Sequence, residues 1–355
     1  MKKIRVGIIF GGRSGEHEVS IISAQSVINA LDKTKYEAVP IFINKKGQWL
    51  LGVEHVYLPA DPTKNKLITL EKPTTAQKTL DVIFPVLHGT FGEDGSVQGL
   101  LELSAVAYVG AGIAASAVGM DKAAMKKIFT SVGLPITKHL IFLRKQVENN
   151  IGVVVDEIEK EISYPIFVKP VNLGSSVGIT KAHSRKELTD GLTIASEYDR
   201  KVIVEQGVDK AREIEVAVLG NDDPKASICG EVVPSKEFYD YEDKYILGKA
   251  KLLIPAPIPE KLSEKIRKMA IDAFKSIDCA GMARVDFLID PKTNRIFVDE
   301  INTIPGFTSI SMYPKLWGAT GLPYNKLIDR VIQLALERYN DKKSNTTNFP
   351  AKLLK

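Results

Sequence analysis

Apolar and polar residues alternate in a regular way over the N-terminal part of the chain. Short apolar runs predict buried strands at 5–10, 37–43, 81–87 and 107–110. The segments between these runs predict helices at 19–31 and 96–103. Because strands that alternate with helices usually form a parallel sheet, we expect a parallel α/β domain over residues 1–120.

The pattern continues with two further groups of elements and a polar end. Strands are predicted at 166–169, from 179 onward, and at 201–206, 213–219 and 226–233. Helices are predicted at 122–132, 186–198, 262–277 and 325–338. From Tyr339 the chain is polar and is expected to be loose. We expect a second structural unit to begin after the helix at 122–132.

Residues 236–255 are polar and aromatic and follow no period. A loop of about twenty residues without its own structure is uncommon in a compact domain, and such loops are usually lids over a site or disordered segments. We interpret this segment as a candidate lid.

Two β-rich runs within 281–311 flank a turn-forming segment at 290–294 and predict a hairpin. A turn that is symmetric about Lys292 places Arg284 opposite Glu300. In that register one face of the hairpin is apolar and suits a core; it carries Val285, Phe287, Phe297 and Ile301.

The other face of the hairpin carries an arginine, two carboxylates and an amide, namely Arg284, Asp286, Glu300 and Asn302. Carboxylate and amide oxygens are the ligands that hard cations such as Mg²⁺ prefer. The pattern therefore predicts a metal site, and a half-solvated sheet face with a cross-strand ion pair is the alternative.

Composition and charge narrow the class of protein. With 355 residues, the chain is too long for one compact core and predicts two or three domains. Hydrophobic residues make up 44% and charged residues 26%, as in ordinary soluble proteins. The net charge of +5 is dispersed along the chain, which argues against nucleic-acid binding. Two cysteines are too few for a disulfide framework or a zinc site and fit a reducing compartment.

The membrane classes are also disfavoured. The opening apolar run is too short for a signal peptide and is better explained as a first strand. No apolar stretch reaches the length of a transmembrane helix. We expect a cytoplasmic protein that binds neither membranes nor nucleic acid.

A glycine- and serine-rich loop at 169–178 is a candidate phosphate site. Such a loop can offer backbone N–H groups and hydroxyls to a polyphosphate, and Lys169 adds a positive charge. The P-loop pattern is absent, and an ordinary Gly/Ser hairpin turn is the alternative.

Two further turns carry candidate ligand groups. The loop 11–16 does not fit the dinucleotide-binding glycine pattern, but a turn before a helix can still form an anion pocket. Glu16 in this loop is better suited to an ammonium group. His88 follows an apolar strand at an edge where open α/β sheets bind ligands, although a hydrogen-bonded histidine in a tight turn is the alternative.

Glu205 ends a strand just before 206–208, where the backbone could read the edge of an adenine. A surface acid at a strand end is the alternative. Taken together, these segments describe a phosphate-covering loop with a lysine, a set of metal-type carboxylates and an α/β domain with an anion pocket.

The chain resembles the ATP-grasp superfamily and, within it, the D-alanine–D-alanine ligases, from about residue 4 to residue 330. The motifs that carry the resemblance are GGRSGEHEVS at 11–20, HGTFGEDGSVQG at 88–99, MDK at 120–122, KPVNLGSSVG at 169–178, FYDYEDKY at 238–245, RVDF at 284–287 and DEINTIPGFTSIS at 299–311. The resemblance implies a three-domain ATP-grasp architecture of α/β and α+β type. The N-terminal domain would bind the first substrate, and the nucleotide would lie between the central (121–212) and C-terminal (213–345) domains.

The resemblance also implies ATP-dependent ligation of two D-alanine molecules through an acyl phosphate, for peptidoglycan precursors, by a homodimer. ATP would contact Lys122, Phe167, Lys169, Ser175, Ser176, Val177, Ile179, Glu205, Val208, Glu213, Phe238, Lys244 and Leu288. Two Mg²⁺ ions, which Mn²⁺ could replace, would be held by Asp286, Glu300 and Asn302.

The same resemblance assigns the substrate-binding and catalytic groups. The substrates would contact Glu16, His88, Tyr245, Arg284, Gly306, Ser311 and Met312. Arg284 and the Gly306 N–H would face the reacting carboxylate. A hydrogen-bonded set of Glu16, Ser175 and Tyr245 would lock the lid, and Ser311 would complete the catalytic group.

Some features depart from the family, and several alternatives stay open. Gly207 and Val208 replace bulkier residues, 209–212 is one residue longer, and Asp299 stands where some relatives are apolar, which leaves the shape of the adenine pocket open. A ligase that takes D-lactate or D-serine second is the close alternative, and Tyr245 argues against lactate. A non-catalytic ATP-binding module and a nicotinamide dehydrogenase are the more distant ones.

Overall fold

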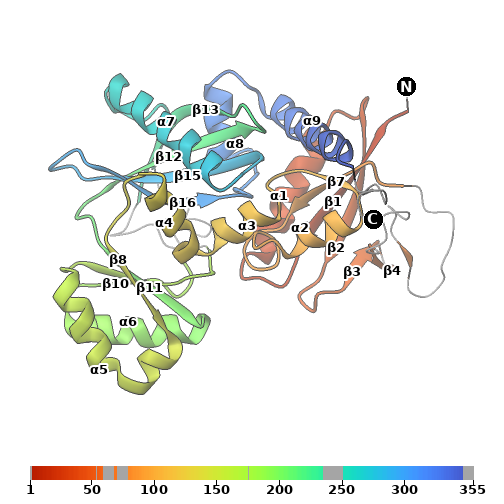
Figure 1. The fold of residues 1–355 in the computed structure, drawn as a ribbon. Coiled ribbons are helices and arrows are strands. Elements are labelled where there is room, and N and C mark those ends of the chain that lie inside the picture. Colours follow the sequence, from red (N-terminus) through yellow and green to blue (C-terminus); the bar gives the residue numbers. More distant parts are fainter. Residues whose placement is uncertain are drawn as a thin grey trace, which may run out of the picture.

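The computed structural model describes residues 2–52, 54–58, 68–69, 79–174, 176–234 and 251–346. These residues form three sheets with helices packed around them (Figure 1). Of the helices in these ranges, none is both long enough and apolar enough to cross a bilayer.

The first sheet has seven strands, in the order β5 (Ile68–Thr69), β4 (Glu54–Tyr57), β3 (Trp49–Leu51), β2 (Tyr36–Ile43), β1 (Ile4–Gly11), β6 (Val82–Val86) and β7 (Ala107–Tyr108). The four strands β2, β1, β6 and β7 are parallel, as predicted, whereas β3, β4 and β5 add an antiparallel edge that was not predicted. The helices of this part are α1 (His17–Ala30), α2 (Ser96–Leu103) and α3 (Ile113–Met120). Because β1 has a parallel neighbour on each side, the turns that follow β1 and β6 meet at one edge of the sheet.

The second sheet is antiparallel, with the order β10 (Thr180–Ala182), β9 (Ile166–Pro170), β11 (Lys201–Gln206) and β8 (His139–Leu143). Its core also includes α5 (Arg144–Glu161) and α6 (Arg185–Tyr198), which lie on the sheet as a separate lobe (Figure 1). Helix α5 was not predicted, because the residues of the segment 149–152 favour a turn; the helix accommodates this segment with a kink at Asn150.

The third sheet is antiparallel, with the order β14 (Lys251–Leu253), β13 (Lys225–Val233), β12 (Arg212–Gly220), β15 (Gly281–Ile289) and β16 (Ile296–Asn302). Its core includes α7 (Glu260–Ser276) and α4 (Lys122–Ser131). The other face carries α8 (Met312–Ala319), and α9 (Tyr324–Lys343) joins this core to the first sheet. The expectation of an unstructured loop over all of 236–255 is wrong at its end, because β14 pairs with β13.

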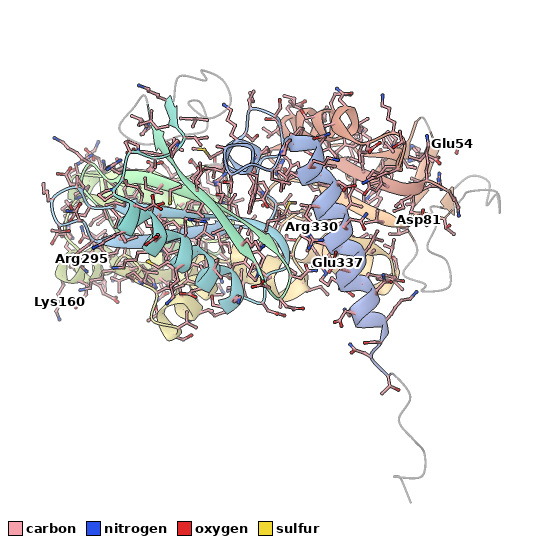
Figure 2. All side chains as sticks on the ribbon, turned by 90° about the horizontal axis from the view of Figure 1, so that it is seen from above. Glu54, Asp81, Lys160, Arg295, Arg330 and Glu337 are labelled. Carbon is pink, nitrogen blue, oxygen red and sulfur yellow. The ribbon has the colours of Figure 1, made fainter. Side chains whose placement is uncertain are left out.

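The C-terminal helix ends later than predicted. The residues from Tyr339 to Lys343 are still helical. This last part of α9 is held by a hydrogen bond, which the Tyr339 hydroxyl donates to the Ala105 carbonyl at 2.6 Å. Figure 2 shows the molecule from above, with Arg330 and Glu337 labelled on α9. In this view α9 lies between the region that carries Glu54 and Asp81 and the region that carries Arg295 and Lys160.

The predicted hairpin forms, but its register is shifted. Arg284 pairs with Asn302 rather than with Glu300, and Glu300 pairs with Asp286. The shift of two residues has two sources. At the turn, Ile289 pairs with Ile296, one position later than symmetry about Lys292 requires. A β-bulge adds the second position, since Asp299 has no opposite residue between the Asp286–Glu300 and Phe287–Val298 pairs. The four polar side chains still share one face.

The bulge also changes the apolar face of the hairpin. Beyond it, Phe287 pairs with Val298, and Val298 is fully buried in the core. Phe297 was expected in the core but is only partly buried and pairs with Leu288.

Candidate active site

A cavity of about 530 Å³ lies between the second and third sheets. Strands β9 and β11 form one wall, strands β12, β15 and β16 form the other, and the turn after β9 lies over it. Most residues predicted to contact ATP or metal line it, namely Lys122, Phe167, Lys169, Ser176, Ile179, Glu205, Val208, Glu213, Asp286, Leu288 and Glu300, and Arg284 joins them.

The remaining predicted residues are distributed differently. Asn302 reaches the cavity through its hydrogen bond with Asp286. Gly306 and Ser311 lie in the loop between β16 and α8, where the Ser311 hydroxyl lies 2.7 Å from that of Thr308. Val177 lies in the turn after β9 but is not part of the cavity wall.

Met312 does not line this cavity either. Its side chain is buried in the core under β13, where a Cβ at Gly230 would meet its sulfur at 3.1 Å. The predicted residues Ser175, Phe238, Lys244 and Tyr245 lie outside the described residues.

Two lysines enter the cavity and are held by protein oxygens. Lys169 Nζ lies 2.8 Å from Glu205 Oε2 and 3.5 Å from Asp299 Oδ1. Burial alone would lower the pKa of Lys169, but the two acids raise it above its usual value. Lys122 Nζ donates to the Leu173 carbonyl at 2.9 Å and lies 3.4 Å from Glu300 Oε2. The ammonium groups of both lysines therefore lie at one cavity.

Arg284 is the centre of the acidic cluster on the β15 face. Its Nε and Nη2 donate to the two Asp286 oxygens at 2.7 and 2.6 Å, and Nε lies 3.0 Å from Glu215 Oε2. Asn302 Nδ2 donates to Asp286 Oδ2 at 3.0 Å. Burial, together with Glu215 and Glu300, raises the pKa of Asp286 to about 7 against the effect of Arg284.

The donor set on this face fits Mg²⁺. All of its ligand groups are oxygens, and Asp286 lies beside the acids Glu215 and Glu300, whose repulsion a divalent cation would offset. Within the described ranges, no three His, Cys, Asp or Glu side chains form a metal cage by themselves. Mg²⁺ usually takes one or two protein carboxylates and completes its shell with waters and substrate phosphates.

Glu215 was missed by the sequence analysis, although a signal was present. It follows Glu213 by two residues in a strand, so both acids share a face. In the sheet, Glu215 lies opposite Asp286. Two acids spaced by two in a strand next to the hairpin could have pointed to it.

A second group of predicted residues lies where the turns after β1 and β6 meet. Glu16 is buried, and its Oε2 would lie 2.8 Å from a Cβ at Gly89 and 3.2 Å from one at Gly174. The glycines therefore allow the first and second sheets to approach this carboxylate.

His88 lies beside Glu16 and has protein partners at both ring nitrogens. Nδ1 lies 3.1 Å from the Ile304 carbonyl and Nε2 lies 3.2 Å from the Ser23 hydroxyl. Burial lowers the pKa of His88, which favours the neutral ring. His88 is therefore arranged as the alternative describes, a hydrogen-bonded histidine in a tight turn. Direct contact between His88 and the substrate stays a prediction.

Glu93 is a further acid that the sequence analysis quoted within a motif but gave no role. Its carboxylate accepts hydrogen bonds from Gly89 N at 2.7 Å and Ile304 N at 3.2 Å, and so ties the turn after β6 to the loop after β16. Burial and the nearby Glu16 raise the pKa of Glu93 to about 8.

Glu93 should make stability depend on pH. Its proton leaves the unfolded chain near the ordinary value of about 4.5 and the folded protein near 8, so the free energy of unfolding falls as pH rises between these values. We expect the melting temperature to fall as pH rises from about 4.5 to about 8, and Glu93→Gln to flatten that fall. Thermal unfolding across this range measures it, with Glu337→Gln on α9 as the control; equal slopes in all three proteins would contradict the prediction.

Comparison with known proteins places this geometry in a family. Residues 5–111 match the family model for the D-ala D-ala ligase N-terminus, and residues 128–333 match that for the D-ala D-ala ligase C-terminus. The chain belongs to the D-alanine–D-alanine ligase family. Relatives named D-alanine--D-alanine ligase include one from Chloroherpeton thalassium, 51% identical over 97% of this chain and 99% of that one. Another, from Natranaerobius thermophilus, is 48% identical over 98% of this chain and 99% of that one.

Solved structures of the family have the same fold. The D-alanine-D-alanine ligase from Coxiella burnetii is 36% identical with a TM-score of 0.82, and covers 97% of each chain. The VanG D-Ala:D-Ser ligase from Enterococcus faecalis is 34% identical with a TM-score of 0.83, covering 94% of this chain and all of that one. The ATP-grasp architecture expected from the resemblance is thereby confirmed.

Proposed function

We propose that the protein joins two D-alanine molecules into D-alanyl-D-alanine, with conversion of ATP to ADP and phosphate, for peptidoglycan precursor synthesis. The observation that carries this is the convergence of two cationic lysines, Arg284 and the Asp286–Glu300 pair on one cavity, in a chain that matches the ligase family over nearly its whole length.

The chemistry explains why such a cavity is needed. A carboxylate is a poor acyl donor, and bound ATP supplies the phosphoryl group that turns it into an acyl phosphate. Bringing a carboxylate and a triphosphate together creates repulsion, which Lys122 and Lys169 offset. Asp286, Glu300 and Asn302 would hold Mg²⁺, or Mn²⁺ in its place, which would neutralise further phosphate charge when bound.

The remaining groups bind and orient the two D-alanine molecules. Glu16, buried between two glycines, would accept the ammonium group of the first. Arg284 and the Gly306 N–H would stabilise the oxyanion that forms when the amine of the second attacks. Ser311, near Gly306, would help to orient the second substrate.

The domain boundaries, the compartment and the oligomeric state complete the proposal. The three sheets support domains at 1–120, 121–212 and 213–345 with a tail at 346–355, although α4 of the second range packs into the core of the third sheet. We also propose a cytoplasmic homodimer, which sedimentation analysis tests.

The proposed reaction can be tested by measuring ADP release with ATP and Mg²⁺, first with D-alanine and then with D-alanine plus D-lactate or D-serine. We expect D-alanine-dependent ADP release and D-alanyl-D-alanine as the product by mass spectrometry. If the enzyme forms a product of D-alanine with D-serine or D-lactate in preference to D-alanyl-D-alanine, it is instead a D-alanine–D-serine or D-alanine–D-lactate ligase. Absence of D-alanine-dependent ADP release would contradict the proposal.

Gly89→Ala should weaken binding of the first D-alanine. Gly89 has a φ of +77°, and an added Cβ would lie 2.8 Å from Glu16 Oε2, so the carboxylate must move from its place. We expect the KM for the first D-alanine to rise at least about tenfold, because a hydrogen bond to a charged group is worth roughly 1.5–3 kcal/mol and the displaced carboxylate would lose it. Gly99→Ala in α2, where a Cβ would meet nothing within 4 Å, is the matched control and should leave KM unchanged.

A further inference from the structure

A third buried lysine, besides the two that line the cavity, lies behind it. Lys126 follows Lys122 by one turn of α4 and is only 1% exposed, among the largest fully buried side chains described. Burying an ammonium group is costly unless it meets a charged partner. Its Nζ lies 3.1 Å from Glu205 Oε1.

Glu205 is thus held from both sides. Oε1 faces Lys126 and Oε2 lies 2.8 Å from Lys169 Nζ, while the carboxylate itself is 3% exposed. Burial alone would raise the pKa of Glu205, but the two lysines lower it to about 2. The group is therefore a carboxylate at every physiological pH.

The two lysines differ in their freedom to leave Glu205. Lys169 lines the cavity and is shared with Asp299, whereas Lys126 is not part of the cavity wall and is enclosed by the protein. If Lys169 turns toward phosphate, Lys126 still neutralises Glu205. Without Lys126, Lys169 would be the main counter-charge of a buried acid, and moving it away would be costly.

We propose that Lys126 is a positioning residue, which holds Glu205 as a charged acceptor for the amino group of the nucleotide base and leaves Lys169 available to the phosphates. This rests on the proposed function for the identity of the nucleotide. It deepens that function by assigning part of the base preference to a residue that does not touch the nucleotide. An amino group donates to a carboxylate, whereas the carbonyl oxygen at the same position of guanine does not.

The test compares Lys126→Met with Lys127→Met, the same change at the next, exposed position of α4. Calorimetry with ADP and with GDP, each with Mg²⁺ and without D-alanine, measures binding directly. We expect Lys126→Met to weaken ADP binding at least about tenfold and to reduce the preference for ADP over GDP. The kcat at saturating ATP should stay within about twofold, Lys127→Met should match the wild type, and Lys126→Arg should recover much of the affinity.

A double variant separates positioning from a merely structural role. Because Lys126 acts through Glu205, Lys126→Met with Glu205→Gln should bind ADP no worse than Glu205→Gln alone. The double variant leaves no unpaired carboxylate in the interior, so it tests the point even if Lys126→Met does not fold.

Unchanged ADP affinity in a folded Lys126→Met protein would overturn the proposal, and so would additive losses in the double variant. Neither result tests the proposed ligase reaction. The proposed reaction would be contradicted by a different result, namely that the wild-type protein releases no ADP in the presence of D-alanine.

Discussion

Arg284→Ala should reduce ligation by on the order of 10² to 10³, because a lost donor to the developing oxyanion costs roughly 3–4 kcal/mol of barrier. Part of the loss has a second source. Arg284 holds both oxygens of Asp286 and one of Glu215, and these two acids lie opposite each other in neighbouring strands. Without the guanidinium they would repel, so the unfolding temperature should fall as well.

Arg284→Lys separates the two effects. It keeps the positive charge between the acids but not the planar fork that reaches both Asp286 oxygens. We expect stability near that of the wild type and a kcat still reduced at least about tenfold. Steady-state ADP release measures the effect on kcat, and thermal unfolding measures the effect on stability. Arg295→Ala, on the exposed turn of the same hairpin, is the control (Figure 2). An Arg284→Ala protein with wild-type turnover would sink the assigned role.

The hairpin shows what the sequence could and could not predict. Period-two alternation placed Arg284, Asp286, Glu300 and Asn302 on one face, and the structure has them there. Their opposite partners were wrong, because the turn is one residue longer than symmetry about Lys292 requires and the β-bulge at Asp299 adds one more residue to the second strand. No local pattern announces such a bulge, since it depends on how the neighbouring strand packs.

The same limit applies to contacts between distant elements. The Gly/Ser loop and its lysine were found from local chemistry, and the structure places them on the cavity with Glu205. The partner of Glu205 on α4 could not be found in this way. Lys126 lies 79 positions earlier in the chain, and only packing brings the two charges together.

Glu93 was missed for another reason. An acid in a turn is usually exposed, and nothing local distinguishes one that the fold buries. For Glu215 the spacing from Glu213 was a local signal, but it did not show that the fold would bury the side chain. The edge strands β3 to β5 were missed because they are short. The parallel strands were easier to predict, because burial on both faces gives them continuous apolar runs.

Glu300→Ala should abolish ligation, with a fall in kcat of at least about 100-fold. Glu300 lies opposite Asp286 and 3.4 Å from Lys122 Nζ, so its carboxylate serves both the proposed metal site and a phosphate lysine. Removing it leaves Asp286 and Asn302 as the proposed protein ligands, and the Mg²⁺ concentration for half-maximal ADP binding should rise. It also relieves the repulsion that raises the pKa of Asp286, so the nucleotide-free protein should not lose stability for that reason.

Two measurements then distinguish a metal role from a structural one. Calorimetric ADP binding over a Mg²⁺ series reports the metal, and thermal unfolding without nucleotide reports the fold. Glu337→Ala, which breaks the exposed Arg330–Glu337 ion pair on α9, should change neither (Figure 2). If the Mg²⁺ dependence of Glu300→Ala equals that of the wild type, the carboxylate is not a metal ligand, and the ion pair with Lys122 would then have to account for any loss of activity.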